Sequence, residues 1–138
     1  MRVFPDTNVL LSAFFGRGLC ADLLQQLIES PGHEILMGEP VMREFVRIAR
    51  AKFRVADADL AYAFEVCARQ TRVPKARKPY PGIIATVPDP GDIPILACAL
   101  AATADCFITG DKALLDFANP SDMSIMSPRQ AWQMLRGA

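Results

Sequence analysis

Two kinds of hydrophobic pattern alternate along the chain. Short apolar runs predict buried strands at residues 2–5, 34–37, 83–87, 106–109 and 124–126. Between these runs, apolar residues recur every three or four positions, which predicts helices at residues 7–15, 19–29, 40–53, 58–72, 92–103, 112–117 and 128–135. Strands that alternate with helices indicate an α/β fold, with a central parallel five-stranded sheet and helices on both faces.

Length and composition add that this sheet belongs to one globular domain. The chain has 138 residues, of which 51% are hydrophobic and 22% charged, so we expect a single domain over residues 1–138 with its own core. No apolar run is long enough to span a membrane, and the first residues lack the apolar segment of a signal peptide. We therefore expect a cytoplasmic protein that has no membrane partner.

Cysteine and histidine usage excludes several kinds of site. The four cysteines form no CxxC pair, which favours reduced core residues over zinc ligands. The single histidine, His33, follows the turn-like segment Ser30-Pro31-Gly32. One histidine cannot build a histidine-rich metal site, and its place in a turn argues against a Ser-His-Asp triad.

Four acidic residues stand near the predicted boundaries between elements. Asp6 and Asp111 follow the first and fourth strands, Glu44 lies one turn into a helix, and Asp92 opens another. The strand ends of a parallel sheet form a crevice where such carboxylates can meet. Crowded carboxylates need a cation between them, and hard oxygen ligands suit Mg²⁺ or Mn²⁺. This pattern predicts a metal-dependent phosphodiester enzyme, in which at least one carboxyl pKa is raised when metal is absent.

Each acid also has a structural explanation. Asp6 and Asp92 can cap helices, although Asp89 can take the capping role and leave Asp92 as a ligand. From spacing alone, Glu44 is better explained by an exposed ion pair with Arg43 or Arg47. The candidate supporting residues around the acids are Asn8, Asp89 and Thr109.

Charge is distributed unevenly although the net charge is zero. Residues 43–78 contain ten Lys or Arg and four Asp or Glu, whereas the flanking parts are both acidic. A basic segment beside acidic strand ends would suit a phosphate backbone, and solvated helix faces are the alternative. The candidate RNA-binding residues are Arg43, Arg47, Arg50, Lys75, Arg77 and Lys78.

Several segments together resemble PIN-domain nucleases, and the resemblance covers nearly the whole chain. The segments are DTNVLLSA at 6–13, VMREF at 41–45 with its helix-borne Glu44, DPGD at 89–92, ITGDKALL at 108–115 and IMSP at 125–128. The sequence is most similar to toxin-like members of that family, relatives of the VapC toxins of bacterial toxin–antitoxin pairs. Two small departures are Gly91, where relatives often carry an acid, and Pro94 in the first turn of its helix.

This resemblance implies a three-layer α/β/α domain and a Mg²⁺- or Mn²⁺-dependent ribonuclease. Asp6, Asp92 and Asp111 would hold the metal, and Glu44, no longer explained as a surface ion pair, would complete the acidic ring. The resemblance also implies a homodimer and inhibition by an antitoxin protein. Apolar residues on more than one side of helices 19–28 and 60–66 favour association as well.

Two alternatives remain open at this stage. A phosphatase of the haloacid dehalogenase class would use Asp111 and Asp116 as its late acidic motif, but the chain has Asn8 where that class needs a second Asp. A degenerate PIN module would only bind RNA or a partner protein, and the presence of all four acids argues against it.

Overall fold

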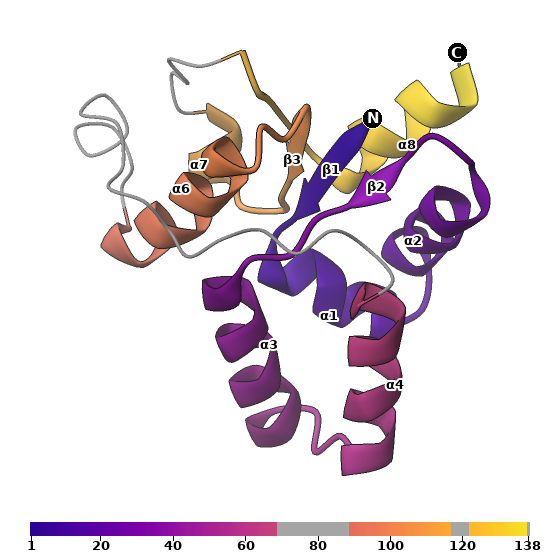
Figure 1. Ribbon diagram of the computed structural model, residues 1–138, viewed down its shortest axis with the longest axis vertical. Helices are drawn as coiled ribbons and strands as arrows, with labels where there is room; N and C mark the ends of the chain where they lie inside the picture. The colour runs from indigo at the N-terminus through magenta and orange to yellow at the C-terminus, as the bar shows by residue number, and fades with distance from the viewer. Residues whose placement is uncertain (69–88, 117–121, 138) are drawn as a thin grey trace.

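A parallel sheet forms the centre of the protein (Figure 1). The structure is a computed structural model that describes residues 1–68, 89–116 and 122–137. The sheet order is β2-β1-β3-β4, and every neighbouring pair is parallel. The strands are β1 (Arg2–Pro5), β2 (Glu34–Ile35), β3 (Cys106–Ile108) and β4 (Ser124–Met126). These four confirm the predicted parallel α/β fold, and the fifth predicted strand, 83–87, lies outside the described residues.

The helices connect the strands much as the apolar spacing predicts. They are α1 (Thr7–Phe15), α2 (Leu19–Glu29), α3 (Glu39–Ala51), α4 (Asp57–Ala68), α6 (Ile93–Ala101), α7 (Lys112–Asp116) and α8 (Pro128–Gly137). A 3-10 turn, η1 (Pro90–Asp92), precedes α6, so the helix predicted from residue 92 begins one residue later. Among the described residues, no helix is long and apolar enough to cross a membrane.

Side chains on the two faces of the sheet build two separate hydrophobic clusters. On one face, Phe4 stacks on Phe107 with ring centroids 5.8 Å apart, and residues of α3 and α6 cover them. On the other face, Val3, Cys106 and Ile108 pack against α2 and α8. Because strand neighbours point to opposite faces, apolar runs such as Cys106–Ile108 serve both layers.

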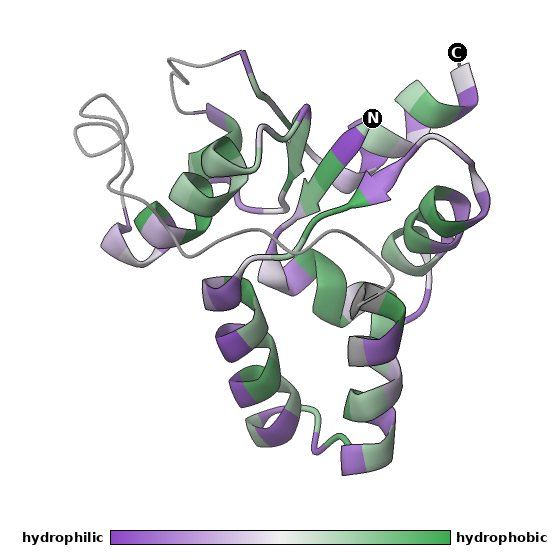
Figure 2. Cartoon of the chain, in the orientation of Figure 1, coloured by the Kyte–Doolittle hydropathy of each residue, from purple (hydrophilic) through white to green (hydrophobic). Residues whose placement is uncertain are grey.

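Hydropathy follows this layering (Figure 2). The central strands are mainly hydrophobic, whereas α3 carries a hydrophilic stripe along one side. Cys98 and Cys106 are buried, as the sequence predicts for core cysteines, whereas Cys20 is half-buried. The hydrophobic layers therefore leave the carboxyl ends of β1 and β3 for polar side chains. These strand ends are called the acidic edge of the sheet below.

Candidate active site

The ends of β1 and β3 bring two acidic segments side by side. Pro5 pairs with Ile108 across the two parallel strands, and the Asp6 N–H donates to the Ile108 carbonyl at 2.8 Å. Asp6 and Thr109 are the next residues along each strand. The register of the sheet therefore joins residues that are 103 positions apart in the sequence.

Thr109 links Asp6 to Asp111 through one hydroxyl group. Its side chain is fully buried, and its Oγ1 donates to Asp6 Oδ2 at 2.9 Å. The same oxygen accepts a hydrogen bond from the Asp111 backbone N–H at 3.1 Å. Thr109 thus orients the Asp6 carboxylate and fixes the backbone on which Asp111 is carried.

Asp6 is both a capping residue and a buried carboxylate. Only 9% of its surface is exposed, and its Oδ1 accepts from the Thr7 N–H at 2.8 Å at the start of α1. Each of its oxygens therefore accepts one hydrogen bond, and a carboxylate has about four acceptor positions. Lone pairs remain for a further ligand.

The two acids before α6 divide their roles. Asp89 Oδ1 accepts from the Gly91 N–H at 2.9 Å and caps η1, whereas the side chain of Asp92 makes no capping hydrogen bond. The Asp92 carboxylate is therefore not used as a cap, which agrees with its predicted role as a metal ligand. A Cβ atom at Gly91 would lie 3.3 Å from Asp89 Oδ1, so a larger residue there would crowd the cap.

Glu44 does not form the ion pair expected from its neighbours. Arg43 instead pairs with Glu39, four residues earlier on α3, and no ion pair of Glu44 occurs within the described part of the chain. The expected ion pair of Glu44 was therefore wrong, because Arg43 pairs with the acid one helical turn away and not with its sequence neighbour. Glu44 is partly buried and acts electrostatically on Asp6 and Asp92.

Burial, and to a smaller extent repulsion between the acids, raises the pKa of two of them. Burial is the largest cause that raises the pKa of Asp92 to about 6, followed by repulsion from Asp6, Asp89, Asp111 and Glu44. Burial also raises the pKa of Asp6, and Glu44 and Asp111 add to this, while hydrogen bonds from Thr109 and Thr7 oppose it. Both shifts have the predicted direction, with burial as the first cause and repulsion between carboxylates as a smaller one.

The donor chemistry of these residues fits a hard divalent cation. All four side chains offer carboxylate oxygens, and Asp6 and Asp92 are destabilised as anions in a way that a bound cation would relieve. Within residues 1–68, 89–116 and 122–137, no three acidic, histidine or cysteine side chains converge on a single point in a coordination arrangement. A cation shared by three of these acids would therefore require side-chain adjustment.

The candidate RNA-binding residues fall into two groups. Arg43, Arg47 and Arg50 are exposed along α3, where Arg50 Nη2 lies 3.7 Å from Asp57 Oδ1. Lys75, Arg77 and Lys78 lie outside the described residues. Asn8, predicted to support the acids, is exposed at the start of α1.

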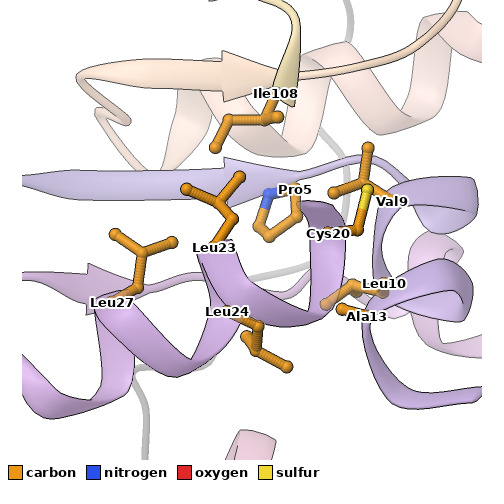
Figure 3. Close-up of a pocket in the computed structure, with 9 residues that line it drawn as sticks. All are labelled: Pro5, Val9, Leu10, Ala13, Cys20, Leu23, Leu24, Leu27 and Ile108. Carbon is orange, nitrogen blue, oxygen red and sulfur yellow. The ribbon is translucent and has the colours of Figure 1, made fainter. Parts of the chain in front are cut away.

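A small apolar pocket between α1, α2 and the strands is a different kind of feature (Figure 3). Its volume is about 10 Å³, enough for one water molecule at most. Its lining is Pro5, Val9, Leu10, Ala13, Cys20, Leu23, Leu24, Leu27 and Ile108. No acid lines it, so the candidate active site is the acidic strand edge.

The parallel sheet and its acidic edge define an α/β protein with a strand-end site. The chain belongs to the PIN domain family, whose sequence profile matches residues 2–113 and confirms the resemblance. Members of this family are typically metal-dependent nucleases. This membership argues against the haloacid dehalogenase alternative.

Comparison with solved structures gives the same fold. The chain is similar to VapBC2 from Rickettsia felis, in a crystal structure bound to a DNA fragment from their promoter, with a TM-score of 0.60. The match covers 92% of this chain and 98% of the other, at 13% sequence identity. At this identity the likeness supports the fold alone. No curated protein gave a match.

Proposed function

We propose that this protein is a Mg²⁺- or Mn²⁺-dependent endoribonuclease. The observation that carries the proposal is the Thr109 hydroxyl that joins the Asp6 carboxylate to the Asp111 backbone, in a PIN domain where Asp92 and Glu44 lie close enough to repel Asp6. Asp6, Asp92 and Asp111 would hold the metal, and Glu44 would complete the acidic ring. When bound, such a metal supplies an activated water and stabilises the oxygen that leaves the phosphodiester.

The protein's own residues would prepare this reaction before RNA arrives. The Thr109 hydroxyl holds the Asp6 carboxylate in one orientation before a cation binds. Asp89 keeps the η1 turn closed and leaves Asp92 available. Asn8 would hydrogen-bond a carboxylate or a bound water. Because the pKa of Asp92 is raised to about 6, its loss of a proton accompanies metal binding at about pH 6 and below.

The basic residues of α3 would bind the RNA backbone. Arg47 is exposed and forms no ion pair among the described residues, so its charge is available, whereas Arg43 and Arg50 are partly neutralised by Glu39 and Asp57. Lys75, Arg77 and Lys78 would extend the positive surface. Their contribution would be independent of RNA sequence and sensitive to salt.

We further propose that the protein is the toxin of a toxin–antitoxin pair. Its fold is similar to that of VapBC2, and its family resemblance is to toxins that act with an antitoxin. The proposed partner protein would cover the acidic strand ends. A neighbouring gene for a small DNA-binding protein, whose product binds this chain and blocks RNA cleavage, is the expected finding. Co-purification that leaves cleavage unaffected would contradict the inhibitor role.

Association into a homodimer would use the large apolar side chains that remain exposed. Leu23, Leu24 and Leu27 of α2 are buried in the monomer, so less apolar surface is left than the sequence suggested. Ile28 and Tyr62 remain 47% and 64% exposed. We propose that such residues lie at a two-fold interface.

RNA cleavage with an acid-to-amide pair of variants tests the main proposal. Wild-type protein should cleave single-stranded RNA with Mg²⁺ or Mn²⁺, and EDTA should abolish cleavage. Asp6→Asn should lower the cleavage rate at least about a hundredfold, because it removes the negative charge of a metal ligand and keeps almost the same side-chain shape. Asp22→Asn, an exposed acid on α2, is the matched control and should cleave normally.

Two outcomes would refute the enzymatic proposal. A fully active Asp6→Asn protein would remove Asp6 from the site. RNA binding without cleavage by the wild-type protein, with either metal, would favour the degenerate module that only binds RNA.

A further inference from the structure

The C-terminal end of α3 exposes an aromatic ring among positive charges. Phe53 is 48% exposed, one of the few large hydrophobic side chains that stand out from the surface among the described residues. Lys52 and Arg54 flank it in the sequence, are exposed, and form no ion pair within the described part of the chain. Residues 47–54 contain four cations and no acid. A single exposed apolar side chain is ordinary, whereas an exposed ring between cations is a suitable contact for a nucleobase.

Two further phenylalanines support the ring of Phe53 from one side. Its centroid lies 6.3 Å from that of Phe15, which lies 5.6 Å from that of Phe45. Phe45 is 1% exposed, so this series of rings leads from the core to the surface. Because Phe53 is held by packing and is still half exposed, a flat ligand that stacks on it loses little affinity to side-chain ordering.

The backbone also fixes the place of Phe53 at the end of α3. The Val55 N–H bonds to the Ala49 carbonyl at 3.1 Å and closes the turn that carries the ring. Within this turn Arg54 has a φ of 49°, a left-handed conformation that is unfavourable for a residue other than glycine. The fold therefore tolerates backbone strain at the residue that follows the exposed ring.

Helix α3 connects this ring with the acidic edge. Glu44, which repels Asp6, lies in the middle of α3, and the helix runs away from the strand ends (Figure 1). Phe53 follows Glu44 by nine positions, which corresponds to about 13 Å along a helix axis. A strand with about 3.4 Å or more per nucleotide spans that length in about four nucleotides or fewer. The exposed cations Arg47 and Arg50 lie along the way.

We propose that Phe53 is a stacking platform for an unpaired base of the RNA substrate, a few nucleotides from the phosphodiester at the acidic edge. This inference rests on the proposed nuclease function for the identity of the ligand. The ring stacks on the face of the base, and the neighbouring cations bind the adjoining phosphates. Bases of a duplex are already stacked on one another, so the platform favours single-stranded RNA. Any base is accepted, since every base has a flat face.

Binding of a short single-stranded oligouridine to the whole protein in EDTA tests the platform. Phe53→Leu keeps an apolar side chain and removes the ring, so Kd should rise about fivefold or more, whereas Phe53→Trp should bind at least as tightly as the wild type. Tyr62→Leu is the matched control, because Tyr62 is 64% exposed on α4, a helix without Lys or Arg, and its Kd should not change. An unchanged Kd for Phe53→Leu would overturn the proposal.

An RNA backbone without bases separates stacking from charge. An abasic oligomer of equal length should bind the wild type and Phe53→Leu equally, because only phosphate contacts remain. Oligouridine should quench tryptophan fluorescence more in Phe53→Trp than in the wild type, whose one tryptophan is Trp132, and the abasic oligomer should not. If Phe53→Leu weakens both oligomers equally, or if the added quenching is absent, the platform is refuted.

Sedimentation and RNA cleavage distinguish this inference from the other proposals. If Phe53→Leu leaves oligouridine binding unchanged and converts a dimer into a monomer, the ring belongs to a protein interface and the platform is refuted. If the wild type binds oligouridine through Phe53 but cleaves no RNA with Mg²⁺ or Mn²⁺, the nuclease function fails and the platform stands. If the wild type cleaves RNA and Phe53→Leu binds and cleaves it equally well, only the platform is refuted.

Discussion

Replacing Asp92 with asparagine should stabilise the metal-free protein at neutral pH. The Asp92 carboxyl has its pKa raised from 3.8 to about 6, first by burial and then by repulsion from four other acids. Its ionised form is therefore less stable in the folded protein than in the unfolded chain. Asparagine removes the charge and breaks no capping hydrogen bond, because the Asp92 side chain makes none.

The size of the effect follows from the shift in pKa. A pKa difference between 3.8 and about 6 corresponds to an upper limit of about 3 kcal/mol. Water screens a partly exposed carboxyl, so we expect about 1 kcal/mol at pH 7.5. For a domain of this size, that gain raises the melting temperature by about 3 °C.

The pH dependence gives the sign of the effect. Below the unfolded pKa of 3.8, Asp92 is protonated in both the folded and the unfolded state. Asp92→Asn is therefore no more stable than the wild type at that pH. As pH rises from 3.8 to about 6, the unfolded chain releases its proton first, and the wild type loses stability relative to Asp92→Asn. Above about pH 6 the difference in unfolding free energy between Asp92→Asn and the wild type stays constant.

Thermal unfolding in EDTA across this pH range checks the prediction, with Asp22→Asn as the exposed control. If Asp92→Asn raises the melting temperature equally at pH 3.5 and pH 7.5, the electrostatic explanation is refuted. A lower melting temperature than the wild type at pH 7.5 would also refute it. Addition of Mg²⁺ should stabilise the wild type more than Asp92→Asn, since the variant has lost a carboxylate.

Three further outcomes follow from the same structure. Thr109→Val should lose about 2 kcal/mol of unfolding free energy in urea, because one of its two hydrogen bonds goes to a carboxylate, and unchanged stability would contradict the Asp6–Thr109 bond. Arg47→Gln should weaken binding to RNA of any sequence and lower the slope of log Kd against log salt concentration by about one. Arg17→Gln should change neither. Sedimentation equilibrium at micromolar concentration should give a dimer mass, and a monomer mass throughout would refute the dimer alone.

The apolar runs were sufficient to predict the centre of the fold. Residues 2–5 and 106–109 have the continuous apolar character of strands covered on both faces, and β1 and β3 lie there. Element ends were harder to predict. The strand expected at 34–37 ends at Ile35, although the Leu36 N–H still bonds to the Val3 carbonyl at 2.8 Å. Apolar pattern alone does not show where pairing stops.

Glu44 shows why one side chain's role could not be read from local spacing. Glu39 stands four residues before Arg43 and faces it across one helical turn, whereas Glu44 is the residue next to Arg43 and points in another direction. Which acid an arginine selects depends on the surroundings of each carboxylate, and Glu44 lies on the side of α3 that acts on Asp6 and Asp92. That information comes from the packing of α3 against the sheet, which no local pattern contains.

The different states of Thr7 and Thr109 have the same origin. Both follow an apolar strand and both become fully buried beside Asp6, so composition and hydropathy treat them alike. Thr109 finds a partner because Ile108 pairs with Pro5, which brings its hydroxyl to Asp6 across the sheet. Thr7 is already in the first turn of α1, and its backbone N–H, not its hydroxyl, bonds to the Asp6 carboxylate. Sheet register and helix start therefore decide which hydroxyl supports the site and which has no hydrogen-bond partner among the described residues.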